Sequence, residues 1–124
     1  MNKIARTVVL LSPALMIFGC GEREVSYSAD VKPFVDKYCI RCHGEGGEGS
    51  EVSGLRMDTH EALMQGTRFG AVVKPGDGFT SALVMLVEGR ADPSLQMPHD
   101  DGDAPTEAEI ELVKTWIDQG AKNN

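Results

Sequence analysis

The sequence has 124 residues, of which 12 are basic and 19 acidic, so its formal net charge at pH 7 is −7. This length leaves room for one domain with a modest core. The acidic balance argues against a nucleic-acid partner, because phosphate backbones require a basic protein surface.

The first residues are typical of an export signal. Lys3 and Arg6 precede the apolar run "VVLLSPALMIF", which a serine and a proline interrupt and which is too short to cross a bilayer as a helix. The run ends in "IFGC", which is similar to the lipobox of bacterial lipoproteins. This motif predicts that residues 1–19 are a signal peptide and that Cys20 becomes the lipidated first residue. Phe18 is unusual in a lipobox, and the alternative is an ordinary signal peptide followed by an incidental cysteine.

Lipidation would also explain the odd number of cysteines, since it leaves Cys39 and Cys42 as a pair. Without residues 1–19 the chain keeps ten basic and nineteen acidic residues, a net charge of −9. Such a surface suits a partner with a basic docking patch, although it can also be merely soluble. The position after Cys20 is occupied by Gly21 and not by the aspartate that is associated with inner-membrane retention in some bacteria. This difference slightly favours the outer membrane.

Residues 20–28 contain the polar stretch "GEREVSYS" and are predicted to be the lipid anchor and its tether, followed by a domain over residues 29–124. The first helix is expected after Asp30, because apolar residues then recur at helical spacing. These are Val31, Phe34, Val35 and Tyr38. The helix runs directly into Cys39 and Cys42.

Loops and short helices are predicted for the middle of the chain. "GEGGEGSEVSG", after His43, is a glycine-rich acidic loop, most simply a flexible insertion without a role. "DTHEALMQG" predicts a short helix capped by Asp58 and stopped by Gly66. "VKPGDGFTSALVMLVEG" predicts a turn and then a helix over about 81–88, closed by Gly89.

The last third combines an irregular segment with the strongest predicted helix. "ADPSLQMPHDDGDAP" carries three prolines and is expected to be irregular. "TEAEIELVKTWIDQGA" begins with Thr106 and Glu109 in a capping-box arrangement, and an apolar stripe follows at helical spacing. Because no useful β-alternation appears, we expect an all-α fold of short helices and long loops.

The stretch "YCIRCHGEGG" carries the most specific chemistry. Residues three apart lie on one face of a helical turn, so Cys39 and Cys42 can reach the two vinyl groups along one edge of a porphyrin. His43 can then ligate the iron. The C-x-x-C-H string is the attachment signature of covalently bound haem c.

Three alternatives compete with haem. A structural zinc site needs four ligands, for which His60 and His99 are available but no second cysteine pair. A thioredoxin-like redox pair expects a βαβ setting, and a plain disulfide leaves the adjoining histidine as a coincidence. Export favours haem, because c-type haem is attached on the outer side of the bacterial inner membrane. The scarcity of aromatic residues also favours haem, since a large flat apolar cofactor would supply much of the core.

A second axial ligand must come from the remaining methionines and histidines. Met64 and Met85 lie in helical apolar patterns, where methionine usually fills the core. Met57 is close to the attachment site. Met97 lies in the loop "LQMPHD", where no local pattern requires a buried thioether, so we predict it as the ligand, with His99 as its main rival.

Beyond the haem motif, the ordered blocks "CIRCHG", "GLRMDTHEALMQG", "VKPGDGFTSALVMLVEG", "LQMP" and "TEAEIELVKTWIDQGA" resemble short planctomycete-type c-type cytochrome domains, related to class I cytochromes c. The resemblance covers about residues 29–121. It implies thioether bonds at Cys39 and Cys42, a proximal His43 and a distal Met97, in a cytochrome c-like fold around one haem.

The resemblance implies further contacts. The first and last helices should pack across each other. Arg56 in "GLRMD" is a hypothetical haem-propionate partner, because an arginine fork suits a carboxylate, and a surface arginine is the alternative. Pro75 is a candidate for the carbonyl that accepts a hydrogen bond from the proximal imidazole.

These observations predict a monohaem c-type cytochrome, lipid-anchored on the periplasmic side, that carries single electrons between redox partners and is not an enzyme. One alternative is an enzyme acting on peroxide or a small gas, if the distal side of the iron is open. The other is a haem-based sensor or assembly subunit.

Overall fold

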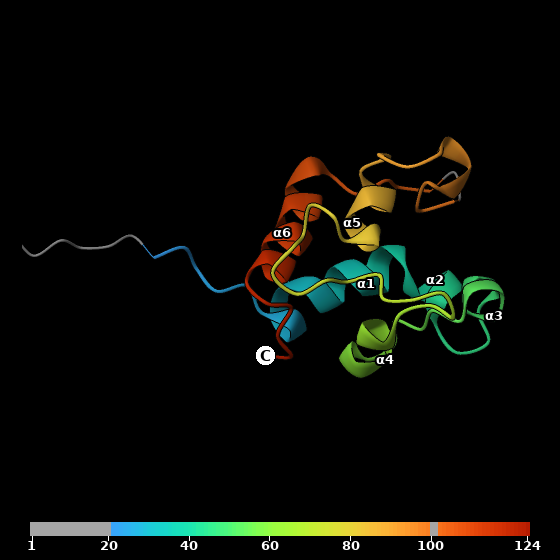
Figure 1. Cartoon of the computed structure of the whole chain (residues 1–124), viewed down its shortest axis with the longest axis horizontal. Helices are drawn as coiled ribbons and strands as arrows, with labels where there is room; N and C mark the ends of the chain where they lie inside the picture. The colour runs from blue at the N-terminus through green and yellow to red at the C-terminus, as the bar shows by residue number, and fades with distance from the viewer. Residues whose placement is uncertain (1–20, 100–101) are drawn as a thin grey trace, which may run out of the picture.

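A computed structural model of the chain describes residues 21–99 and 102–124. The predicted signal peptide and Cys20 lie outside the described residues. Within them the fold is helical, without strands apart from an isolated bridge between Thr67 and Gly70, as the sequence predicts (Figure 1). No helix in this part of the chain has the length and hydrophobicity needed to cross a membrane. In chain order the elements are η1 (Tyr27–Val31), α1 (Lys32–Tyr38), α2 (Ile40–His43), α3 (Glu48–Ser53), α4 (His60–Gln65), α5 (Ala82–Val87), η2 (Pro93–Leu95) and α6 (Glu107–Asp118).

The helix ends follow local capping chemistry. Thr106 and Glu109 form the predicted capping box at the start of α6, where each side chain accepts a hydrogen bond from the other residue's backbone. α5 lies within the range expected for it. The cap of α4 differs by one residue from the prediction, because Thr59 rather than Asp58 accepts from the Ala62 N–H.

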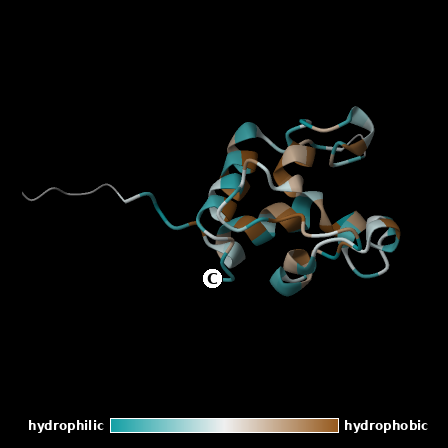
Figure 2. Cartoon of the chain, viewed as in Figure 1, coloured by the Kyte–Doolittle hydropathy of each residue, from teal (hydrophilic) through white to brown (hydrophobic). Residues whose placement is uncertain are grey.

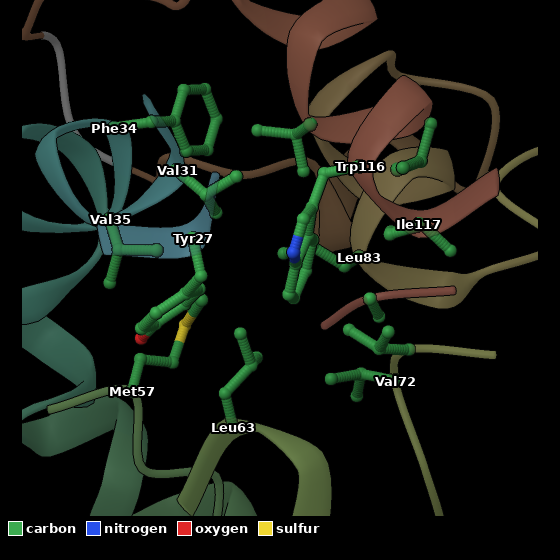
Figure 3. Close-up of a cluster of buried hydrophobic side chains, with 14 of the residues drawn as sticks. Tyr27, Val31, Phe34, Val35, Met57, Leu63, Val72, Leu83, Trp116 and Ile117 are labelled. Carbon is green, nitrogen blue, oxygen red and sulfur yellow. The ribbon is translucent and has the colours of Figure 1, made fainter. Parts of the chain in front are cut away.

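Side chains from the first and last helical segments meet in one hydrophobic core (Figure 3). The Trp116 indole is 1% exposed, and its ring centroid lies 5.5 Å from that of Tyr27 and 5.9 Å from that of His60. The outer side of α6 is hydrophilic, whereas α5 is largely hydrophobic (Figure 2). The first helical segment therefore contacts the last helix as expected, but η1 provides the main packing against α6 and α1 reaches it through side chains such as Tyr38.

The N-terminal segment is bound to the C-terminal one, which corrects the expected tether over residues 20–28. Val25 and Tyr27 are each only 5% exposed. The Val25 N–H donates to Gln119 Oε1 at 2.7 Å, and the Tyr27 N–H donates to Asn124 Oδ1 at 2.8 Å. Because these contacts join residues more than ninety positions apart, they leave no local pattern in the sequence. The packed structure thus begins before residue 29.

The glycine-rich segment after His43 is also more ordered than predicted, since it contains α3. The Ser50 hydroxyl lies 2.8 Å from the Gly44 carbonyl oxygen and 2.7 Å from that of Gly47, and it can donate to either. A Cβ at Gly47 would lie 2.4 Å from the Cys42 carbonyl oxygen, so a side chain there would prevent the segment from folding back on α2. The interpretation as a flexible insertion was wrong.

Candidate haem site

Cys39, Cys42 and His43 lie on consecutive turns at the junction of α1 and α2. The His43 N–H donates to the Cys39 carbonyl at 2.9 Å, which continues the helical path through the motif. Cys39 is half-buried and Cys42 is exposed, and neither is in a disulfide. The geometry thus leaves both thiols free, in contrast to the disulfide alternative.

A cavity of about 450 Å³ opens beside this motif. This volume falls within the range of roughly 300–1,000 Å³ that is usual for small-molecule and cofactor pockets. The lining is mostly apolar and comes from α2, α3, α5 and the loop around Met97. It includes Cys39, Cys42, His43, Glu48, Gly49, Val52, Ser53, Leu55, Met57, Leu83, Leu86, Val87, Met97 and His99.

The cavity brings together four of the five predicted cofactor-binding residues, although they are far apart in sequence. Cys39, Cys42 and His43 come from one side of it, and Met97 comes from the loop after α5. Met97 is partly buried against the core. Arg56 is the exception, because it is absent from the lining.

His43 is held with one ring nitrogen available. Its side chain is 8% exposed, and its Nδ1 lies 3.3 Å from the Leu55 carbonyl oxygen. A carbonyl can only accept, so Nδ1 carries the proton and donates. Nε2 then keeps its lone pair, which is the form of imidazole that binds a metal. The acceptor is Leu55 and not Pro75, which corrects the carbonyl that we expected from the resemblance.

α3 lies directly against the His43 ring. A Cβ on Gly49 would be 2.8 Å from His43 Cε1 and 3.1 Å from Nδ1, so only glycine permits this approach without displacement. The carbonyl of His43 also accepts from the Met57 N–H at 2.8 Å. The imidazole is therefore held between Gly49 and the Leu55 carbonyl, while Met57 holds the His43 backbone.

The Cys39 thiol has the opposite character to a redox-active cysteine. Burial, followed by the nearby Asp36 and Cys42, raises the pKa of Cys39 to about 12. Catalytic and redox thiols instead have a lowered pKa in electropositive surroundings. This environment does not suit a thioredoxin-like pair, whereas a thioether sulfur carries no charge and can be buried.

The zinc alternative gains no support either. Among residues 21–99 and 102–124 there is no group of three or more His, Cys, Asp or Glu side chains placed to hold a metal ion. His60 is directed elsewhere, with Nε2 2.8 Å from the Ala121 carbonyl oxygen and its ring edge-on to Tyr27.

The structure narrows the candidates for a second axial ligand. Met97, its rival His99 and Met57 line the cavity, whereas Met64 and Met85 do not. Met57 is 1% exposed and forms part of the core. Met97 remains our prediction for the ligand.

Arg56 forms a paired hydrogen bond with a carboxylate of its own chain. Nε and one terminal nitrogen donate to Asp58 at 2.9 and 2.6 Å, and Glu45 lies 3.7 Å away. The hydrogen bond to Asp58 raises the pKa of Arg56. A role of Arg56 toward a haem propionate stays a prediction. Arg56 would then have to exchange Asp58 for the propionate or bind both carboxylates.

Several residues of the site were not singled out by sequence reasoning. Gly49 and Leu55 contact the His43 ring, and the Ser53 hydroxyl bonds to both of them. Val52 is 71% exposed although it lines the cavity. Leu55 acts through its backbone carbonyl, for which a sequence contains no signal. The repeated glycines after His43 were visible and could have been interpreted as close backbone contacts.

The residues present fit a covalently bound haem: two free thiols, an oriented imidazole and a thioether border one largely apolar cavity. Fold and site thus define a small all-α domain of the cytochrome c-like class. Residues 39–101, about half of the chain, match the family of planctomycete cytochrome C, and the chain belongs to that family. No curated protein and no solved structure matches it. The family implies a c-type cytochrome with covalently bound haem c and a general role in electron transfer.

Proposed function

We propose that this chain is a monohaem electron carrier in which Cys39 and Cys42 form the thioether bonds and His43 and Met97 are the axial ligands. The observation that carries this proposal is the cavity bordered by all four residues. When bound, haem iron supplies one-electron chemistry by alternating between its ferric and ferrous states. With His43 and Met97 both bound to the iron, the ligand set would raise the reduction potential and leave no open site for a substrate.

The chain's own residues contribute orientation and exclusion of water. The Leu55 carbonyl holds the His43 Nδ1 proton, so that Nε2 is presented as a ligand. The apolar side chains of α5, including Leu83, Leu86 and Val87, restrict the access of water to the cavity. Low polarity around a redox centre is one of the means by which a protein sets its potential.

The experiment that tests this assignment compares Met97→Ala with His99→Ala and Met64→Ala in the oxidised protein. Met64 lies outside the cavity lining, so Met64→Ala is a matched control for the loss of a thioether. We expect the sulfur-to-iron charge-transfer band in the parent, in His99→Ala and in Met64→Ala, and its loss in Met97→Ala. A band that survives in Met97→Ala, or is lost only in His99→Ala, would refute the assignment. Rapid binding of external ligands by the parent would instead support an enzyme with an open iron site.

We also propose that the protein is a periplasmic lipoprotein, anchored through Cys20, with the outer membrane slightly favoured. The lipobox supports this proposal. Since Val25 and Tyr27 are buried, only residues 21–24 separate Cys20 from the packed structure, a span of at most about 14 Å. Residues 21–24 leave the fold at the end opposite α2 and α3 (Figure 1). The anchored domain would thus present its haem site away from the membrane.

Redox proteins with a basic docking patch are the proposed partners, because the chain without residues 1–19 carries a net charge of −9. Long-range attraction between opposite charges accelerates encounter and is screened by salt over a Debye length of about 8 Å at 0.15 M. Electron-transfer rates with a basic soluble carrier should fall as ionic strength rises. Rates that do not change with salt would count against electrostatic docking.

A further inference from the structure

Ser53, the last residue of α3, joins the two chain segments that enclose the His43 imidazole. Its hydroxyl donates to the Gly49 carbonyl at 2.6 Å and accepts from the Leu55 N–H at 3.1 Å. Gly49 lies against the ring at Cε1 and Nδ1, while the Leu55 carbonyl accepts the Nδ1 proton. One hydroxyl therefore sets the distance between the two groups that orient the ring.

The second serine of α3 provides a contrast. The Ser50 hydroxyl also bonds to backbone carbonyls, those of Gly44 and Gly47, but it makes no bond to Leu55. Both serines thus lie in α3, and the hydroxyl of each donates a hydrogen bond to a backbone carbonyl. They differ in whether that bond reaches the acceptor of the His43 proton.

We infer that Ser53 is a positioning residue that sets the reduction potential of the haem by holding the Leu55 carbonyl in place for His43. This inference rests on the proposed function, in which His43 binds the iron. A hydrogen bond from Nδ1 increases the basicity of a ligating imidazole and fixes its orientation. A more basic ligand favours ferric iron, so a looser bond to Leu55 raises the potential.

The test measures reduction potentials of the haem-loaded parent, Ser53→Ala, Ser53→Thr and Ser50→Ala. In Ser53→Ala we expect the equilibrium between oxidised and reduced protein to shift toward the reduced form by about threefold to tenfold. This corresponds to roughly 30–60 mV for one electron, at about 59 mV per factor of ten. Ser53→Thr keeps the hydroxyl and should retain the parent potential, and Ser50→Ala should leave it unchanged.

A second measurement separates positioning of His43 from direct contact between Ser53 and the haem. In the reduced protein, NMR follows the exchange of the His43 Nδ1 proton with deuterium. We expect faster exchange in Ser53→Ala than in the parent and in Ser50→Ala. A shifted potential without faster exchange would overturn the inference.

Three further outcomes are distinguishable. If Ser53→Ala fails to mature, the isosteric pair Ser53→Thr and Ser53→Val decides the question, because only the threonine keeps a hydroxyl. If the absorption spectrum and mass show haem in every variant and all potentials agree, the inference fails while the proposed function stands. If the parent itself contains no haem, the proposed function fails.

Discussion

The Tyr38 hydroxyl donates to the carboxylate of Glu109, with distances of 2.9 and 3.1 Å to its two oxygens. This contact joins the last residue of α1, next to the haem motif, to the first turn of α6. Glu109 also accepts from the Thr106 N–H at 2.8 Å. A single carboxylate thus both caps a helix and connects two distant parts of the chain.

This arrangement predicts a specific dependence of stability on pH. Hydrogen bonds from the Thr106 backbone, the Thr106 hydroxyl and the Tyr38 hydroxyl lower the pKa of Glu109 to about 2, from an ordinary value of 4.5. A lowered folded-state pKa stabilises the fold above the unfolded-state value, and this contribution is lost as pH falls toward 2. Glu109→Gln should therefore be less stable than the parent above pH 5, and the difference should shrink between pH 4.5 and 2. Chemical denaturation at several pH values measures it, and a constant difference across this window would contradict the prediction.

The two tyrosines of the domain should respond differently to loss of their hydroxyls. Among the described residues, the Tyr27 hydroxyl is buried without a hydrogen-bond partner, and replacing such a group with an apolar one is nearly neutral or stabilising. Tyr27→Phe should therefore leave the free energy of unfolding unchanged or raise it by up to about 1 kcal/mol. Tyr38→Phe loses the bond to Glu109 and should lower it. Denaturant titration of both variants checks the pair, and a clear loss of stability in Tyr27→Phe would be the contrary result.

Features that leave a side-chain pattern at short spacing were predictable from the sequence, whereas distant contacts and bonds to backbone carbonyls were not. The Thr106 and Glu109 capping box involves residues three apart, and its pattern is visible in the sequence. The segment around Tyr27 is bonded to Asn124, 97 positions away. The helix after His43 was missed although its contacts are local, because they include bonds from the Ser50 hydroxyl to backbone carbonyls, which any residue supplies. The side chains of the haem motif could be named in advance. Their backbone partner Leu55 could not, because any residue supplies a carbonyl.

Trp116 should be a main determinant of stability. It is 1% exposed, contacts Tyr27 and His60, and donates from Nε1 to the Lys122 carbonyl at 2.9 Å. Trp116→Ala should cost about 3–5 kcal/mol of unfolding free energy. Phe69 is 87% exposed, so Phe69→Ala should change stability by less than about 0.5 kcal/mol. Equal losses in the two variants, measured with haem attached, would disprove this division between core and surface.

Cys20→Ser tests the proposed anchor. The variant should lose the lipid and appear in the soluble periplasmic fraction, while its visible spectrum stays that of the parent because Cys20 has no part in haem attachment. Fractionation followed by immunoblotting and absorption spectroscopy gives both readouts. Retention of the variant in the membrane fraction would count against the lipobox assignment.

The central claim is that a haem is attached to Cys39 and Cys42, and intact mass combined with the visible spectrum of the purified protein tests it most directly. We predict the mass of the polypeptide plus its lipid and one haem, together with a c-type spectrum. Cys42→Ala should block normal maturation and leave a largely unfolded chain. Colourless parent protein, with a mass explained by polypeptide and lipid alone, would contradict the account.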